Sequence, residues 1–203
     1  MNATIVIILI TCLISWLAFK DNRWFTELIL WPPAIKRGKQ YYRLISYGFI
    51  HADLSHLLFN MITLYFFGSL IEQFVSSYIG VLGFVAFYLS AIVVSILPTY
   101  IKNVDNPDYR SLGASGAVSA VLFAFVLLQP WTTILVFFIP CPAIIYAVLY
   151  IAYSIYMDRK GGDNINHSAH LWGAAYGVLF LLCMEPRLIG NFLEQLSQPR
   201  FLS

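Results

Sequence analysis

Long apolar segments recur along this chain, and they restrict the folds that it can adopt. A helix needs roughly 20 apolar residues to cross the hydrocarbon core of a bilayer. Lipid offers the backbone no hydrogen-bonding partner, so a segment inside the membrane satisfies its own polar groups by forming a helix. Only 11% of the 203 residues are charged and 60% are hydrophobic, whereas about 25% are charged in a soluble domain. The sequence therefore predicts an all-α integral membrane protein.

The spacing of the apolar segments predicts six transmembrane helices in one domain. We expect this domain to cover residues 1–203, with a six-helix core at about 3–184 and a short C-terminal tail at 185–203. The first apolar segment has neither a charged start nor a small-residue cleavage site, so it is interpreted as a span rather than a signal peptide. The predicted spans cover about residues 3–19, 55–73, 79–100, 111–128, 142–157 and 167–184.

Three other segments have features typical of the membrane surface. Residues 20–50 combine basic and aromatic side chains, which favour the headgroup region. We expect short interfacial helices there, interrupted at Pro32-Pro33. Residues 131–140 are apolar but end in proline, which predicts a re-entrant or interfacial loop. A short interfacial helix is expected in the C-terminal tail.

A serine with glycines close on both sides opens the fourth predicted span. Gly113 and Gly116 flank Ser115, and glycine lets another backbone approach while leaving a side chain accessible. One interpretation is helix packing, because small residues recur here at four-residue spacing. The stripes are Gly113 with Ala117, and Gly116 with Ala120 and Ala124. The other interpretation is a nucleophile, because polar groups at membrane depth are costly and by default functional.

A histidine within the sixth span favours the second interpretation. His170 lies in an apolar segment, and a buried polar group without a hydrogen bond is penalised. A serine hydroxyl is a poor nucleophile until a base takes its proton, and histidine titrates in a suitable range. Because neither span contains an acidic residue, we predict a dyad of Ser115 and His170 rather than a triad.

Small residues on the sixth span indicate how the two side chains meet. Gly173 and Gly177 are four residues apart, which allows close approach to the small face of the fourth span. His170 and Gly173 are three residues apart and share a helix face. We therefore expect packing of these glycines against Gly113, Gly116 and Ala117 to bring the imidazole next to Ser115.

Polar groups on the second span are candidates for stabilising an oxyanion, which acyl transfer requires. His56 and Asn60 lie one helical turn apart on one face, and both carry possible donors. The backbone N–H of Ser115, near a helix N-terminus and close to Gly113, is the third candidate. An alternative of equal weight is that His56 and Asn60 bond only to neighbouring loops.

We expect no metal, cofactor or nucleic acid. His51 and His56 are five residues apart and would face different sides of a helix, and the span that holds His167 and His170 contains no carboxylate. No H-E-x-x-H motif is present. No basic run indicates nucleic acid, and the net charge is only +2. The three cysteines lack C-x-x-C spacing, so they are interpreted as small buried hydrophobes.

Three motifs occur in a fixed order along the chain. They are H-A-D-L-S-H-L-L-F-N-M at 51–61, G-A-S-G at 113–116 and A-H-L-W-G at 169–173. With these motifs the chain resembles the rhomboid family of intramembrane serine proteases over its six-helix core. The resemblance implies a Ser115 nucleophile and a His170 base. It also implies oxyanion stabilisation by Asn60 and His56.

The resemblance further implies a water-filled cavity and substrates that are themselves membrane segments, cut near small residues. Arg43 and Glu72 fall where the family often has structural polar residues. One departure concerns Ser119, because some rhomboids have a tyrosine four residues after the serine, against which the histidine packs. Here we expect Trp172 or helix packing to orient His170 instead.

Three classes of function are compared on these grounds. The leading hypothesis is an active intramembrane serine protease. A catalytically inactive relative is the second, and the retained serine and histidine argue against it. A small transporter or channel is the third. The lack of an internal repeat argues against it, as does Glu72 being the only charged residue within the predicted spans.

Charge bias and family resemblance predict opposite orientations. Of the 12 Lys and Arg residues, all but Arg187 and Arg200 follow the first, third and fifth spans, and the positive-inside rule would place them in the cytoplasm. The resemblance implies an active site that opens to the extracytoplasmic side of a bacterial inner membrane. We follow the resemblance, because most of these basic residues lie in the predicted surface segment, residues 20–50.

Overall fold

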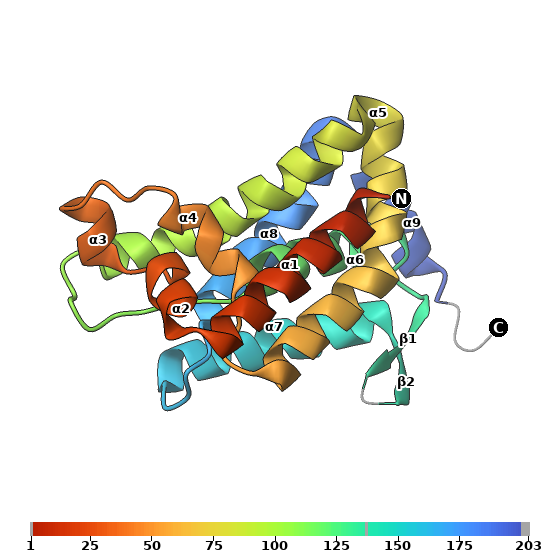
Figure 1. Cartoon of the computed structure of the whole chain (residues 1–203). Coiled ribbons are helices and arrows are strands. Elements are labelled where there is room, and N and C mark those ends of the chain that lie inside the picture. Colours follow the sequence, from red (N-terminus) through yellow and green to blue (C-terminus); the bar gives the residue numbers. More distant parts are fainter. Residues whose placement is uncertain (1, 137, 200–203) are drawn as a thin grey trace.

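The structure is a computed structural model that describes residues 2–136 and 138–199. Helices form most of it, and a two-stranded sheet lies at one end of the bundle (Figure 1). The elements are α1 (Ala3–Lys20), α2 (Asn22–Leu28), α3 (Pro32–Lys36), α4 (Arg43–Ser46), the 3-10 helix η1 (Tyr47–Phe49), α5 (Leu54–Lys102), α6 (Ser115–Leu128), β1 (Thr133–Val136), β2 (Ile139–Pro142), α7 (Ala143–Lys160), α8 (His167–Met184) and α9 (Leu188–Ser197).

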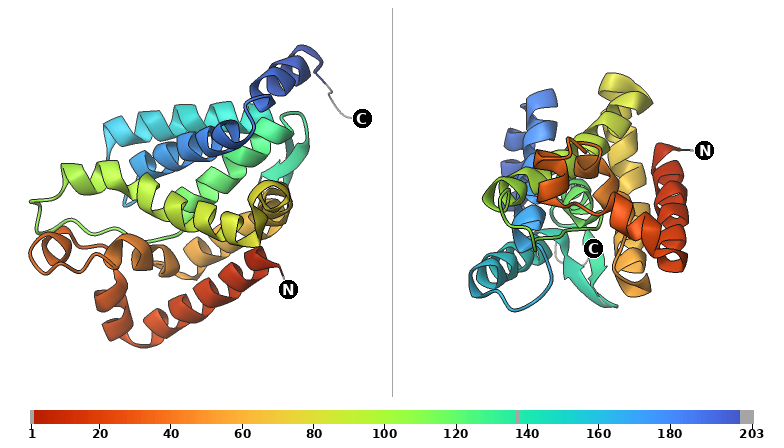
Figure 2. Two further views of the ribbon diagram at one scale, coloured as in Figure 1. Left: turned by 90° about the horizontal axis from the view of Figure 1, so that it is seen from above. Right: turned by 60° about the vertical axis from the view of Figure 1, so that its left-hand side comes forward.

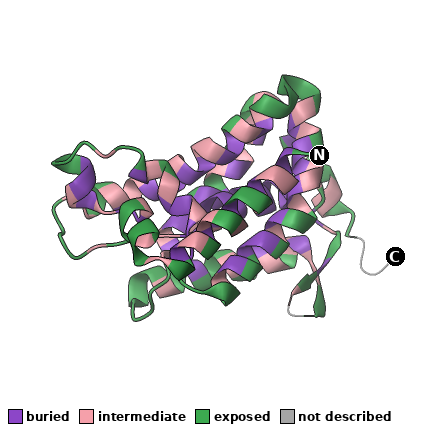
Figure 3. Cartoon of the chain, in the orientation of Figure 1, coloured by how far each residue is buried: buried purple, intermediate pink, exposed green. Residues whose placement is uncertain are grey.

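Helix α6 is the central helix of the bundle. It packs against α5 and α8, and residues 116–127 are all buried (Figures 2 and 3). Its small residues let the neighbouring backbones come close. The outer helices instead expose large apolar side chains, such as Trp16 of α1, Leu82 of α5 and Leu149 of α7. An apolar exterior around a packed centre is expected for a protein whose solvent is lipid.

A reversal at Gly80 divides α5 into two legs. The second and third predicted spans are joined in this one helical segment, and Gly80 has non-helical backbone angles (φ 75°, ψ 170°). Residues with a Cβ rarely adopt a positive φ, so a glycine permits the reversal at little cost. Figure 1 shows the two legs diverging from this bend.

Among the described residues, three helices are long and apolar enough to cross a membrane: α1, α5 and α8. Helix α6 is apolar but has only 14 residues. Helix α7 has 18 residues and ends in Asp158, Arg159 and Lys160. The structure is thus a helical membrane domain, and the count of six spans remains a prediction.

Short helices occupy the segment between α1 and α5. Helix α3 begins at Pro32, a favourable residue in a first turn, because the N–H that it lacks would have no partner there. The expected interruption at Pro32-Pro33 is therefore also the start of a helix.

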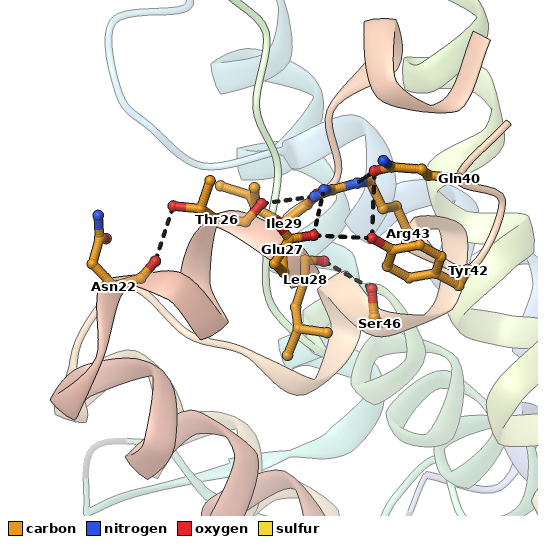
Figure 4. A network of polar contacts seen from close by, with 9 residues as sticks. All are labelled: Asn22, Thr26, Glu27, Leu28, Ile29, Gln40, Tyr42, Arg43 and Ser46. Atoms are coloured by element: carbon orange, nitrogen blue, oxygen red, sulfur yellow. Dashed lines mark hydrogen bonds and ion pairs between the residues drawn. The ribbon is translucent and has the colours of Figure 1, made fainter. Parts of the chain in front are cut away.

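Arg43 holds this segment together from a buried position (Figure 4). Its Nη1 donates to the carbonyl oxygens of Thr26, at 2.8 Å, and Ile29, at 2.9 Å. Its Nε donates to Oε1 of Gln40 at 2.6 Å. Because a guanidinium offers five donors in a fixed plane, one side chain can tie the end of α2 to the start of α4.

The loops that precede α5, α6 and α8 lie at one end of the bundle. Trp31 Nε1 donates to the carbonyl of Pro107 at 2.9 Å. Asn166 Nδ2 donates to the hydroxyl of Tyr109 at 3.0 Å. The Gly80 bend, the hairpin and α9 lie at the other end (Figure 1). The first of these ends is thereby fixed by contacts between segments that are far apart in the sequence.

The expected loop at residues 131–140 is wrong in one respect, because it contains a β-hairpin. Strands β1 and β2 pair antiparallel, with Thr133 opposite Pro142 and Val136 opposite Ile139. Proline is tolerated in an edge strand, and both strands of a two-stranded sheet are edges. The prolines therefore exclude a helix here but not a strand. Residue 137 lies outside the described residues.

Glu72 fixes the start of α1 against α5. Its carboxylate accepts hydrogen bonds from the backbone N–H groups of Ala3, at 2.7 Å, and Thr4, at 2.8 Å, and from the Thr4 hydroxyl at 2.7 Å. Helix N-termini have unpaired N–H groups and a positive dipole end. The buried carboxylate satisfies both needs.

Glu72→Leu is therefore expected to lower the melting temperature of the detergent-solubilised protein. Each buried donor left without a partner costs about 1–3 kcal/mol. Thermal unfolding followed by circular dichroism measures the effect. Glu194→Leu, on the exposed side of α9, is the matched control. Equal melting temperatures for the two variants would contradict the role of Glu72 in holding α1.

Candidate active site

The hydroxyl of Ser115 and the imidazole of His170 are in direct contact. Ser115 Oγ lies 2.7 Å from His170 Nε2. Ser115 is the first residue of α6, and His170 lies in the first turn of α8. The start of α8 is fixed by Asn166, whose Oδ1 accepts the N–H of Ala169 at 3.0 Å, as expected for an N-cap. Two helix N-termini thus bring the candidate nucleophile and the candidate base together.

Close packing of α6 on α8 accompanies this contact. A Cβ built on Gly173 would overlap the carbonyl group of Gly116, and one built on Gly177 would overlap the carbonyl group of Ala120. A Cβ on Gly116 would in turn overlap the Ser95 side chain of α5. The absence of side chains at these glycines is what allows the backbones of α6 and α8 to touch.

The loop that leads into Ser115 is held by backbone contacts on both sides. Leu30 and Ser111 exchange two backbone hydrogen bonds, at 3.1 and 3.2 Å. The N–H of Gly113 donates to the carbonyl of Tyr47 at 2.9 Å. Gly113 has φ +111°, and a Cβ there would lie 2.7 Å from Cε1 of His56. Only glycine fits this position, because both the backbone angle and the imidazole exclude a side chain.

His51 holds the same loop from a fully buried position. Its Nδ1 lies 2.9 Å from Ser15 Oγ, and Ser15 Oγ in turn donates to the Phe49 carbonyl at 2.9 Å. The backbone N–H of Ala114 points to His51 Nε2 at 3.4 Å. This network assigns the proton to Nδ1 and leaves Nε2 as an acceptor.

From the sequence we consider His51 only as a possible metal ligand, and we do not predict its contact with the loop before Ser115. Its partners lie 36 and 63 residues away along the chain. No local pattern predicts such pairs.

The three expected oxyanion donors differ in their surroundings. The His56 ring lies against Gly113, two residues from Ser115. Asn60 is buried, and its Nδ2 donates to the carbonyl of His56 within the same helix at 2.9 Å. An amide group has two N–H donors, so one remains. The backbone N–H of Ser115 lies in the first turn of α6, where a helix provides no partner.

The ring that packs against His170 comes from α7. Tyr150 stacks on the imidazole with 6.1 Å between ring centroids and 28° between planes. Its hydroxyl lies 2.7 Å from Ser119 Oγ. Of the two expected ways to orient His170, Trp172 is 50% exposed, and packing against a neighbouring helix places Tyr150 on the ring. Ser119 is therefore linked to the His170 ring through Tyr150 of α7.

No carboxylate contacts His170 among the described residues. Asp163, in the loop before α8, contacts Nε2 of His167 at 3.0 Å instead. The His167 ring meets the His170 ring edge-on, with 5.9 Å between centroids. The hydrogen bond to Asp163 keeps the pKa of this carboxyl below its usual range. In the described part of the chain, no three His, Cys, Asp or Glu side chains converge as a metal site would need.

Comparison with known proteins identifies the family. The rhomboid domain model matches residues 38–187. RHOMBOID-like protein 12, mitochondrial, of Arabidopsis thaliana is 33% identical over 180 residues, which are 82% of this chain and 53% of that protein. Presenilin-associated rhomboid-like protein, mitochondrial, of Mus musculus is 35% identical over 141 residues, 66% of this chain and 35% of that protein. The rhomboid protein YdcA of Bacillus subtilis is 27% identical over 149 residues, 73% of this chain and 70% of that protein.

The chain spans about half the length, or less, of the two mitochondrial relatives. The matched domain nevertheless contains both Ser115 and His170 and extends to either side of them. The chain belongs to the rhomboid family.

Proposed function

We propose that the protein is an intramembrane serine endopeptidase that cleaves transmembrane segments of other membrane proteins. The observation that carries the proposal is the 2.7 Å contact between Ser115 Oγ and His170 Nε2. A nucleophile within hydrogen-bond reach of a base is the signature of nucleophilic catalysis. Membership of the rhomboid family supports the same reaction class.

The reaction that these two residues support is acyl transfer to serine and then to water. His170 Nε2 takes the Ser115 proton as Oγ attacks the scissile carbonyl carbon. The resulting imidazolium returns the proton to the leaving amine, and the amide C–N bond breaks. A water molecule, deprotonated by His170, then hydrolyses the acyl-enzyme. No cofactor or metal takes part in these steps.

The negative oxygen of the tetrahedral intermediate would be stabilised by donors around Ser115. We assign this role to the backbone N–H of Ser115, the imidazole of His56 and the remaining amide N–H of Asn60, with Gly113 giving His56 access. Each candidate lies on α5, on α6 or on the loop that enters α6. Pre-oriented donors of this kind stabilise charge only as it develops.

The proposed setting is a single rhomboid unit with six spans in contact with membrane lipids. The two legs of α5 count separately, and α1, α6, α7 and α8 supply the rest. Rhomboid relatives occur by name in mitochondria and also in a bacterium. The names of these relatives therefore do not favour a bacterial inner membrane, which the resemblance led us to expect, over a mitochondrial membrane.

A cleavage assay with the purified protein tests the proposal. A labelled transmembrane peptide is incubated with the detergent-solubilised enzyme, with and without a serine-reactive fluorophosphonate. We expect cleavage that stops when the fluorophosphonate modifies Ser115, as mass spectrometry can show. A folded protein that neither cleaves peptides nor reacts with the probe would instead be a catalytically inactive relative.

Asn60→Ala is expected to slow cleavage without abolishing it. Removal of one oxyanion donor typically costs about 10²–10³-fold in rate. The rate per folded molecule and the melting temperature are measured on one preparation. If Asn60 serves only α5 through its bond to His56, the melting temperature will fall while the rate per folded molecule stays unchanged.

The orientation of the active site is tested by cysteine labelling. The basic residues before α5 and the loops before α6 and α8 lie at one end of the bundle, so the conflict between charge bias and family resemblance remains. In a chain with its own cysteines replaced by alanine, we expect Tyr41→Cys to react with an impermeant maleimide outside intact cells. Gln198→Cys, at the other end, is the control. Labelling of Gln198→Cys alone would show that the charge rule was right.

A further inference from the structure

Tyr150 is the aromatic contact of His170 on α7, and its hydroxyl is fixed on a second helix. The ring stacks on the imidazole at 6.1 Å. The hydroxyl meets Ser119 Oγ of α6 at 2.7 Å. Ser119 lies four residues after Ser115, so both hydroxyls are on the same face of α6, one turn apart. Three helices therefore meet around the imidazole.

His170 has few other constraints on its ring. Among the described residues, the only hydrogen bond of the imidazole is the one between Nε2 and the Ser115 hydroxyl, and Asp163 contacts His167 rather than His170. The terminal torsion of a histidine is broad and has no sharp preferred angle. A base without a carboxylate on its second nitrogen thus needs another contact to keep Nε2 aimed at the serine.

Tyr150 differs from its neighbours on α7 in what its ring contacts. The buried residues of α7 are Ala143, Ala147 and Ser154, all small. Several large side chains of the helix, such as Leu149 and Tyr153, are exposed, and Tyr146 packs on the Tyr150 ring with 5.7 Å between centroids. Tyr150 differs from them, because its ring faces the imidazole and Phe123 of α6, at 5.5 Å between centroids.

We propose that Tyr150 is a positioning residue, which holds the His170 ring in the orientation that lets Nε2 take the Ser115 proton, and that Ser119 anchors Tyr150. The inference rests on the proposed dyad and deepens it. Its chemical content is that a hydroxyl pair between α6 and α7 supplies the orientation that a carboxylate supplies in a triad. Ser119, which stands where some rhomboids have a tyrosine, then acts together with Tyr150 to orient His170.

The test compares four single variants of the full chain in detergent. Tyr150→Leu removes the ring, Tyr150→Phe removes only the hydroxyl, and Ser119→Ala removes the anchor. Tyr156→Leu is the matched control, because Tyr156 is an exposed tyrosine of the same helix. For each variant, kcat and KM for a transmembrane peptide, the rate of fluorophosphonate labelling and the melting temperature are measured.

We expect Tyr150→Leu to lower kcat by about 10²-fold, because misplacement of a reacting group by about 1 Å has an effect of that size. KM is expected to stay unchanged, since the peptide does not depend on this contact for binding. Tyr150→Phe keeps the ring but loses the contact with Ser119, so its kcat should lie between those of Tyr150→Leu and the wild type. Ser119→Ala should lower kcat by a smaller factor than Tyr150→Leu, and Tyr156→Leu should match the wild type.

The anchor is tested by a double variant. If Ser119 acts only through Tyr150, Ser119→Ala has no further effect on kcat once Tyr150→Leu is present, because coupled residues are not additive. Should Tyr150→Leu not fold, Ser119→Ala and Tyr150→Phe decide, and wild-type kcat for Ser119→Ala overturns the inference.

Two other outcomes are also decisive and can be told apart. Equal kcat for Tyr150→Leu and Tyr156→Leu, or a rise in KM alone, would overturn the positioning role while the dyad stands. A wild-type protein that neither labels at Ser115 nor cleaves would overturn the proposed function, and this inference with it.

Discussion

We expect Ser115→Ala and His170→Ala each to abolish peptide cleavage, while the variant proteins remain folded in detergent. This is the largest effect that we expect, because the two side chains share the contact at 2.7 Å on which the chemistry depends. Loss of the nucleophile or the base of a serine hydrolase costs on the order of 10⁴–10⁶-fold in kcat. Both residues are only partly buried, so the melting temperature should change little.

The measurement is cleavage of a labelled transmembrane peptide per folded molecule, with fluorophosphonate labelling in parallel. Ser77→Ala, an exposed serine of α5 that bonds only within its own helix, is the control and should behave as the wild type. EDTA should leave the wild-type rate unchanged. Wild-type turnover by purified Ser115→Ala would sink the dyad, and activity lost in EDTA and restored by zinc would favour a metal site.

Gly173→Val should reduce activity by orders of magnitude with Ser115 and His170 both intact. Gly173 lies one turn from His170 and faces the carbonyl group of Gly116, which a Cβ would overlap. Helix α8 would have to move away from α6, and a shift of about 1 Å at reacting groups costs on the order of 10²-fold in rate. Overpacking of a tight contact also costs about 1–3 kcal/mol of stability. Even Gly173→Ala should be harmful, because the overlap involves the first side-chain carbon.

Two glycines serve as comparisons. Gly190→Val, in α9, has nothing within 4 Å of the added carbon and should be neutral. Gly177→Val meets the carbonyl group of Ala120, one turn farther from the dyad, so it should lower the melting temperature at least as much and kcat less. Near-normal cleavage by Gly173→Val would show that the approach of α8 to α6 does not position the dyad.

The sequence alone determined the class of the fold and the chemistry that was worth looking for. Apolar length and the lack of charge require helices in lipid, whatever the tertiary arrangement. Helix α8 spans the residues expected, 167–184, and α6 ends at Leu128 as expected but begins at Ser115 rather than at the start of the motif, residue 111. Their ends carry local signals, such as the proline after α6 and the Asn166 cap of α8. A serine and a histidine within these apolar helices stood out because polar groups at membrane depth are costly.

Other features depend on the tertiary structure, since no local pattern contains them. Pro140 excludes a helix, but whether its segment becomes a loop or a hairpin depends on pairing between β1 and β2. Tyr150 reaches His170 and Ser119 only because α7 packs beside α6 and α8. On the sequence it is one of several aromatic residues in an apolar helix. The spacing of residues along a helix predicts which of them share a face. Only the packing of the helices decides which neighbour that face contacts, and the same packing sets the orientation of the imidazole.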